Sequence, residues 1–115
     1  MLIEALAISH LKTKLNTTNV YAQIPETIPP EFVVVRVDER DETNHISSAT
    51  LEIGSYSNDK YHAAILDQSV RRAMESLIES DYVTKSELGG GRDSQDDVLK
   101  KHRYLSYINV IYYDD

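Results

Sequence analysis

Apolar side chains recur at helical spacing over the first fifteen residues of the chain, and the set comprises Leu2, Ile3, Leu6, Ala7, Leu11 and Leu15. Glu4, Lys12 and Lys14 occupy other positions of the same stretch, so the pattern predicts an amphipathic helix. The following residues, Asn16-Thr17-Thr18-Asn19, disfavour helix interiors because their side chains compete for backbone hydrogen bonds. The helix is therefore expected to end there.

Three apolar segments that follow have the patterns of β-strands. Val20–Ile24 is short and is closed by Pro25, which favours a brief strand. Phe32–Val37 is a nearly continuous β-branched run, which is typical of a central strand buried on both faces. Ala49–Tyr56 alternates apolar and polar positions, so one face should meet the core and the other solvent or a neighbouring subunit.

The strongest helical pattern follows Ser57-Asn58-Asp59, which supplies candidate N-caps. Its apolar stripe comprises Ala63, Leu66, Val70, Ala73, Met74 and Leu77. Polar residues lie opposite the stripe, and we expect that face to be mainly solvated; they are Gln68, Arg72, Glu75 and Glu79. Tyr82–Thr84 is predicted to start a short strand, and Tyr104–Tyr113 a long one.

This order of elements predicts an α+β fold. We expect a mixed or antiparallel sheet of about four to five strands, with two helices packed on one face. The 115 residues fit one domain, spanning positions 1–115, that is large enough to bury a core.

Two polar stretches, Asp38–Ser47 and Leu88–Asp97, separate the predicted strands and are expected to be loops. The first exceeds the connections of about two to five residues that hairpins prefer. Long loops in compact domains are usually functional or disordered, so we predict that these two acidic loops serve assembly or recognition. The residues predicted to make assembly contacts are Asp38, Glu39, Arg40, Asp41, Glu42, Asn44, His45, Gly89, Gly90, Gly91, Arg92, Asp93, Asp96 and Asp97.

Aromatic usage is skewed, with eight tyrosines, one phenylalanine and no tryptophan. A tyrosine combines a large apolar ring with a hydrogen-bonding tip, which suits partly wet contacts between subunits. Four tyrosines of the last strand and one arginine of the second helix are therefore candidate subunit contacts: Tyr104, Tyr107, Tyr112, Tyr113 and Arg72. The alternatives are that the tyrosines cover the edge of the core and that the arginine is simply solvated.

Charge and composition argue against several classes of function. The net charge is −7, from 19 acidic and 12 basic residues without a dense basic patch, so tight nucleic-acid binding is not expected. There are no cysteines, which excludes disulfides, thiol nucleophiles and cysteine zinc sites. No segment has the roughly 20 apolar residues of a membrane span, and the N-terminus lacks a basic signal-like region. We therefore expect no contact with a membrane.

Catalytic and cofactor motifs are also missing. The triple glycine Gly89–Gly91 is not followed by the Lys-Ser or Lys-Thr pair of a phosphate-binding loop. The four histidines are scattered, and Gly54-Ser55-Tyr56 lacks the second glycine of a nucleophile elbow. Catalytic groups assembled from distant positions remain open at this stage. We expect no enzyme activity, no cofactor and no metal ion.

From about Val20 onward, the hydrophobic and turn pattern resembles the small tail-completion, or tail-terminator, proteins of long-tailed bacteriophages. The matching positions are Pro25-Glu26, Pro29-Pro30, Phe32-Val33-Val34-Val35, Leu51-Glu52-Ile53, Tyr56-Ser57, Ala63, Leu66, Val70-Arg71, Leu77 and Arg103-Tyr104. Many members of that family carry glycines after the valine-rich strand. Here Asp38-Glu39-Arg40-Asp41-Glu42 takes their place, so the loop geometry should differ.

The resemblance implies a structural virion protein without turnover, assembled in the host bacterial cytoplasm and located in the neck or tail. It implies a ring, commonly a hexamer, that caps the tail tube and joins the head connector. The expected partners are other copies of the chain, the tail-tube protein and the head-connector protein. DNA would pass through the lumen without specific binding, and an acidic lumen would repel its phosphates. The alternatives are a head-side neck component, or a small host α+β binding module or enzyme.

Overall fold

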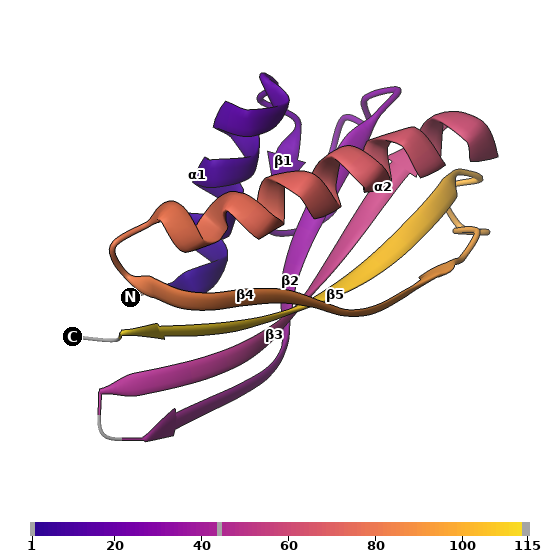
Figure 1. The fold of residues 1–115 in the computed structure, drawn as a ribbon. Helices are drawn as coiled ribbons and strands as arrows, with labels where there is room; N and C mark the ends of the chain where they lie inside the picture. The colour runs from indigo at the N-terminus through magenta and orange to yellow at the C-terminus, as the bar shows by residue number, and fades with distance from the viewer. Residues whose placement is uncertain (1, 44, 114–115) are drawn as a thin grey trace.

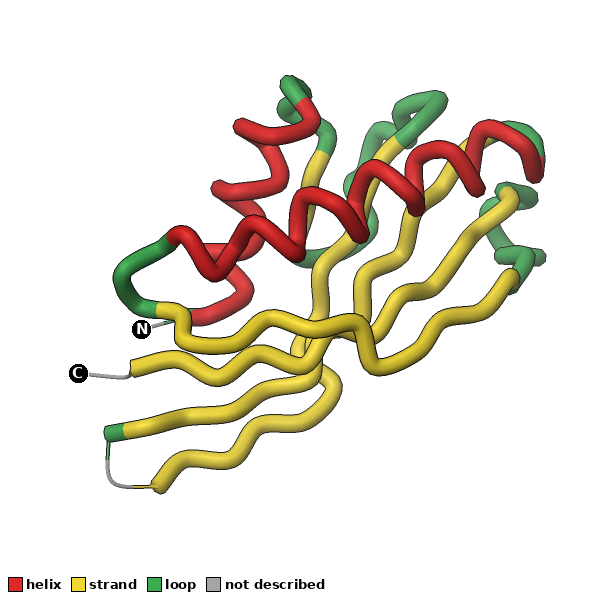
Figure 2. Tube along the Cα trace, in the orientation of Figure 1, coloured by secondary structure: helices red, strands yellow, loops and turns green. Residues whose placement is uncertain are grey.

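In the computed structural model, two α-helices lie on one face of a five-stranded sheet (Figures 1 and 2). The structure describes residues 2–43 and 45–113. Their elements are α1 (Ile3–Leu15), β1 (Val20–Tyr21), β2 (Phe32–Thr43), β3 (Ile46–Ser57), α2 (Lys60–Glu75), the 3₁₀ helix η1 (Ser76–Glu79), β4 (Val83–Asp93) and β5 (His102–Tyr113). The predicted α+β architecture is confirmed.

The sheet is mixed, with the strand order β1-β2-β3-β5-β4. β1 runs parallel to β2, and the other neighbouring strands are antiparallel. β1 pairs only with Val33 and Val34, so most of the outer edge of β2 has no strand partner within the described residues. β4 forms the opposite edge. The middle strand is thus β3, rather than the segment Phe32–Val37 that was expected to be central.

Both helices form where the apolar spacing predicts them. α1 ends at Asn16, which adopts a left-handed conformation (φ 53°) and donates its backbone N–H to the carbonyls of the last turn. α2 begins after Asp59, whose carboxylate accepts the backbone N–H of His62 and so caps the helix. Their inward sides and the facing strands form the main core, which includes Ile3, Ala7, Leu11, Val33, Val35, Leu51, Ile53, Val70, Met74, Leu77, Ile108 and Val110.

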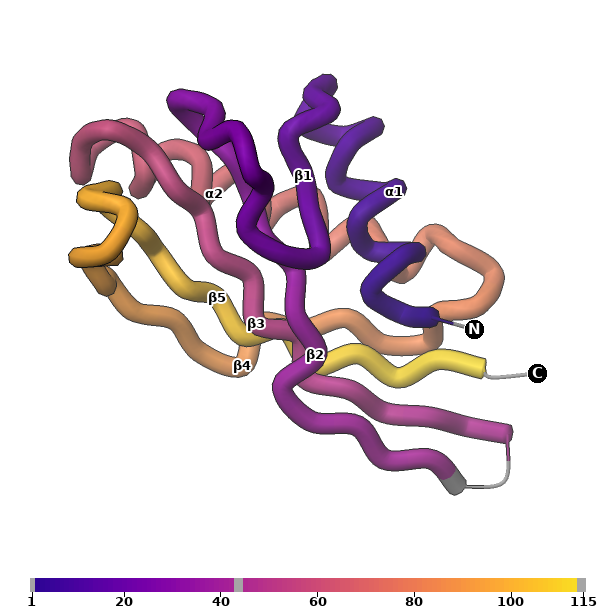
Figure 3. The backbone as a smooth tube through the Cα atoms, turned by 180° about the vertical axis from the view of Figure 1, so that it is seen from behind, coloured from indigo at the N-terminus to yellow at the C-terminus, as the bar shows by residue number. Residues whose placement is uncertain are grey.

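A smaller apolar cluster lies on the opposite face of the sheet. Phe32 and Tyr56 stack there with ring centroids 4.5 Å apart, and Val34 completes the buried set. Ile24, in the connection between β1 and β2, and Leu99 pack against this cluster. Figure 3 shows that connection running across this side of the sheet. The predicted burial on both faces is thus confirmed for Phe32–Val35, whereas Arg36 is exposed.

The first polar stretch, Asp38–Ser47, is not a loop, so this prediction is wrong. β2 continues to Thr43 and β3 starts at Ile46, which leaves only a short turn that includes His45. The stretch forms strands because each residue of Glu39–Thr43 has a partner on β3, and β5 supports the other side of β3. Asn44, one of the predicted contacts, lies outside the described residues.

The second polar stretch was also expected to be a loop, and most of it is strand. Leu88–Asp93 belongs to β4, which extends well beyond the short strand predicted at Tyr82–Thr84. Backbone pairing with β5 holds this glycine-rich segment in the sheet, with a register irregularity between Leu88 and Gly90. Only residues 94–101 connect β4 to β5.

Candidate assembly surfaces

The outer edge of β2 carries an acidic segment, residues 38–42, in which every side chain is exposed. Arg40 donates from Nη2 to the Glu4 carboxylate of α1, at 3.1 Å to Oε2, so its charge is already paired. Among the described residues, none of the carboxylates Asp38, Glu39, Asp41 and Glu42 forms an ion pair. The predicted acidic stretch is therefore a strand edge rather than a loop, and its part in assembly stays a prediction.

Alternation along β2 divides the acidic segment between two faces. Arg40 lies on the helix side, since it contacts α1, and Glu39 and Asp41 lie on the other side. There they border a shallow hollow of about 610 Å³, whose lining also includes Thr50, Lys85 and Asn109. His45, in the turn at the end of the segment, is exposed and has a positive φ of 68°.

A groove of about 480 Å³ separates α1 from α2 on the outer side of the helix layer. Its lining comprises Lys14, Leu15, Ser69, Arg72, Ala73 and Ser76. Arg72 is exposed, and neither it nor Lys14 forms an ion pair within residues 2–43 and 45–113. The candidate contact Arg72 therefore belongs to a small basic groove.

The glycines of β4 meet a steric requirement. A Cβ atom on Gly91 would clash with the Arg71 guanidinium and would lie 2.9 Å from the carbonyl oxygen of Leu105. A Cβ atom on Gly89 would clash with the amide of Asn109. Gly90 has a φ of 156° and open space around it. The glycines thus allow close packing along β4, whereas the sequence suggested a flexible loop.

Two of the predicted acidic contacts are engaged within the subunit. Asp93 pairs with Lys60 at 3.1 Å, and its hydrogen bond raises the pKa of that ammonium group. Asp96 accepts the backbone N–H groups of Val98 and Leu99, both at 3.0 Å, and holds the β4–β5 connection in shape. The neighbouring Arg92 and Asp97 are exposed, and their part in assembly stays a prediction.

The four tyrosines of β5 differ in their surroundings. Tyr112 is only 1% exposed and belongs to the main core, so the prediction that it contacts another subunit is wrong. The alternation of side chains along β5 places Tyr112 on the helix face of the sheet. The sequence alone, a run of aromatic residues with polar tips, does not reveal this. Tyr107 is half-buried and donates its hydroxyl to Glu52, and Tyr104 is also half-buried. Tyr113 is 47% exposed. These three stay candidate contacts.

Sequence reasoning missed a buried polar network between α2 and the sheet. Asp67 is 4% exposed and Ser106 is fully buried, and the serine hydroxyl donates to the carboxylate. Arg71 pairs with Asp67 at 2.8 Å and donates to Ser106 at 3.1 Å. The i,i+4 spacing of Asp67 and Arg71 was the available signal. Because the two charges are paired with each other and the Ser106 hydroxyl is hydrogen-bonded, the network ties α2 to β5.

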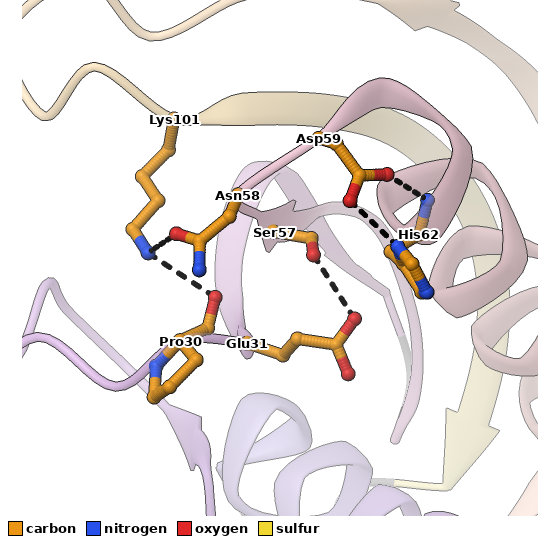
Figure 4. A network of polar contacts seen from close by, with 7 residues as sticks. All are labelled: Pro30, Glu31, Ser57, Asn58, Asp59, His62 and Lys101. Carbon is orange, nitrogen blue, oxygen red and sulfur yellow. Dashed lines mark hydrogen bonds and ion pairs between the residues drawn. The ribbon is translucent and has the colours of Figure 1, made fainter.

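A second polar network surrounds the start of α2 (Figure 4). Both oxygens of Asp59 accept from His62, one from the backbone N–H at 2.8 Å and one from Nδ1 at 2.6 Å. These hydrogen bonds lower the pKa of Asp59, and the side-chain bond raises the pKa of His62. Ser57 donates to Glu31, and Lys101 donates to the carbonyl of Pro30 and to Asn58. The network fastens the start of β2 and the end of β3 together.

The described residues contain neither a metal-binding group nor a membrane-crossing helix. Within the described ranges, no cluster of three or more histidine, aspartate or glutamate side chains could hold a metal ion. None of the helices in that part of the chain is long and apolar enough to cross a membrane.

Comparison with known proteins gives a likeness of fold. No protein-family model matches the sequence. No curated protein matches it either. Among solved structures, the chain is similar to one from the "Virion of native gene transfer agent (GTA) particle", with a TM-score of 0.71 at 12% sequence identity. The match covers 96% of this chain and 94% of that chain, so the two folds agree over nearly their whole lengths.

Proposed function

We propose that the protein is a structural subunit of a phage-type virion. The observation that carries this proposal is the agreement of fold, over 96% of the chain, with a chain of a gene transfer agent virion. The resemblance of the sequence to tail-terminator proteins points in the same direction and was drawn from different information. Fold alone does not define function, so the proposal depends on the assembly experiments below.

The finer proposal is a ring at the junction of head and tail, in the manner of tail terminators. The subunits would cap the tail tube and contact the head connector, without enzymatic turnover. Two features support an assembly role: the sheet has edges without strand partners in the described residues, and the acidic edge of β2 carries four exposed, unpaired carboxylates. Edges and charged surfaces of this kind are where a neighbouring chain can bind.

The net charge of −7 suits a ring through which DNA passes without binding. We expect the purified protein to leave duplex DNA unretarded in a gel-shift assay at physiological salt. A shift that disappears steeply as salt rises would indicate phosphate binding and would count against this role.

Assembly with tail tubes tests the function directly. Tail tubes produced without a terminator would be mixed with the protein and imaged by negative-stain electron microscopy, and we expect density at one end of each tube. Binding to isolated head connectors but not to tubes would favour the head-side neck alternative. A protein that binds neither component would overturn the virion proposal.

A variant pair makes the experiment specific for the acidic edge. Glu39→Gln with Asp41→Asn removes two exposed charges from β2, and we expect fewer capped tubes. The matched control, Glu26→Gln with Glu79→Gln, removes two exposed charges elsewhere and should cap tubes as the native protein does. If both variants cap equal numbers of tubes, the acidic edge contacts neither the tube nor a neighbouring subunit of the ring.

A further inference from the structure

We propose that the basic groove between α1 and α2 receives the acidic edge of a second copy of this chain, so that subunits join head to tail. The inference deepens the proposed function, and the formation of a ring rests on that function. The contact itself requires only two copies of the protein and can be tested without any virion component.

The groove has the shape and charge of a receptor for an anionic segment. Lys14 and Arg72 line it from the two helices, and no carboxylate is among its lining residues. Ser69 and Ser76 add hydroxyl groups, and Leu15 adds an apolar surface. The exposed carboxylate of Glu75, on the same helix as Arg72, does not line the groove. Cationic side chains without an ion pair favour an anionic partner.

The groove is held open by a contact between the helices. Nε2 of His10 in α1 lies 2.7 Å from the carbonyl oxygen of Ala73 and 2.9 Å from the hydroxyl of Ser76 in α2. This contact fixes the spacing of α1 and α2 at one end of the groove. A receptor with a fixed spacing loses little conformational freedom when it binds.

The acidic segment of β2 supplies a matching occupant. Its four carboxylates are exposed and unpaired, and Arg40 is already paired with Glu4, so the segment presents negative charge. Because β1 pairs with β2 only at Val33 and Val34, the segment is also extended and accessible along one side. A narrow, extended, acidic strand fits a groove between two helices better than a rounded surface would.

The two surfaces lie at different ends of the molecule. In Figure 1, the end of α1 that leads to β1 is at the top, whereas the β2–β3 hairpin points to the bottom left. The acidic segment is held in the sheet by its pairing with β3, so one subunit cannot fold its own acidic edge into its own groove. The contact must therefore join different surfaces of two copies. Such a heterologous contact repeats from copy to copy, and it closes into a ring when the rotation permits.

Nuclear magnetic resonance of the native protein provides the first measurement. Backbone amide spectra would be recorded over a series of protein concentrations and of salt concentrations. We expect shifts with rising concentration at residues 38–42 and around Lys14 and Arg72, and we expect salt to reverse them because exposed ion pairs are screened. No shift at these two surfaces, or shifts at only one of them, would overturn the contact.

Neutralised variants then separate the two halves of the contact. One variant carries Lys14→Gln and Arg72→Gln, and the other carries Glu39→Gln and Asp41→Asn. Each alone should associate about tenfold more weakly, the effect expected from losing two exposed ion pairs. A mixture of the two should form dimers, because an intact groove meets an intact edge. If the mixture stays monomeric at concentrations where the native protein associates, the assignment fails.

Charge exchange and two controls complete the test. A variant with both surfaces reversed, Lys14→Glu, Arg72→Glu, Glu39→Lys and Asp41→Lys, should regain association that either reversed half lacks. The control Arg36→Gln with Lys100→Gln removes exposed cations outside the groove and should associate normally. Duplex DNA should leave the groove signals unchanged; if DNA shifts them, the groove binds phosphate and the proposal is wrong. Tube capping by a native protein that never self-associates would reject this contact while sparing the proposed function.

Discussion

At the scale of single residues, Gly91 and Arg71 form a tight contact between β4 and α2. Any side chain at position 91 must displace the Arg71 guanidinium, which pairs with the buried carboxylate of Asp67, and must also press on the Leu105 carbonyl. We expect Gly91→Ala to lower the free energy of unfolding by about 1–3 kcal/mol, the usual cost of overpacking. Urea denaturation followed by circular dichroism measures it.

A double-mutant cycle checks the cause of that loss. With Arg71→Ala, part of the clash disappears, so Gly91→Ala should cost less than it does in the native background. If the two losses simply add, the backbone contact with Leu105 accounts for the whole effect and the guanidinium does not contribute.

Asp59 and His62 give the start of α2 a dependence on pH. The pKa of Asp59 is lowered, so its contribution to stability is present above its ordinary value of 3.8 and is lost as the pH falls through the lowered value. The pKa of His62 is raised, so its contribution is present below 6.5 and is lost as the pH rises through the raised value. The pair stabilises the fold most between about pH 4 and 6.5.

Asp59→Asn tests this pair because asparagine keeps the helix cap but removes the charge. We expect the difference in melting temperature between the variant and the native protein to be largest between about pH 4 and 6.5 and to shrink on both sides. The His62 proton resonances should titrate at lower pH in the variant. An unchanged titration would mean that the aspartate does not hold the histidine proton in solution. Both side chains are more than half exposed, so the effect should be small.

At the scale of elements, the β2–β3 hairpin extends away from the helix layer (Figure 1). None of the described residues in 41–48 belongs to the main core, although buried Ser47 pairs with the core residue Tyr112 across β5. Arg40 and Ala49 are Cα partners, so Asn-Gly in place of residues 41–48 would close a two-residue turn. The shortened protein should keep its circular dichroism spectrum, with a modest fall in melting temperature, and should lose self-association. Loss of the fold would show that the hairpin's role is structural.

The elements that the sequence predicted correctly are those in which apolar residues meet the core. α1 and α2 carry a stripe at helical spacing, and Phe32–Val35 is buried on both faces of the sheet. The outer half of β2 lacks such a stripe, because its side chains are exposed and its strand form depends on pairing with β3. That pairing, like the packing of Gly91 under Arg71, joins positions far apart in the chain. Local patterns in a single sequence carry little information about such long-range pairing and packing.

The sequence predicted the composition of the candidate surfaces better than their three-dimensional form. The sequence identified the acidic residues 38–42 and singled out Arg72, since unusual charge is visible without a structure. It did not bring Arg72 together with Lys14, because that depends on how α1 and α2 pack. It also placed Tyr112 on the surface, where the register of β5 puts it in the core.

At the scale of the whole molecule, the proposed self-association should make stability depend on protein concentration. Binding that occurs only between folded subunits shifts the equilibrium away from the unfolded state. We expect the melting temperature to rise with protein concentration at low salt and to become independent of concentration at high salt. Differential scanning calorimetry measures both. A melting temperature that never changes with concentration would argue against contacts between free subunits.

Under the proposed function, the short reach of β1 has a consequence for the time before a particle is built. Because β1 covers only Val33 and Val34, each new subunit carries a long open strand edge through the interval between synthesis and use. Such edges invite uncontrolled fibre growth, and charged side chains and bulges discourage it. Here the carboxylates beyond Val37 make two like edges repel, and the irregularity after Val37 disturbs the regular pairing of two such edges. The same charges would thus keep a reserve of subunits dispersed until a different surface accepts them.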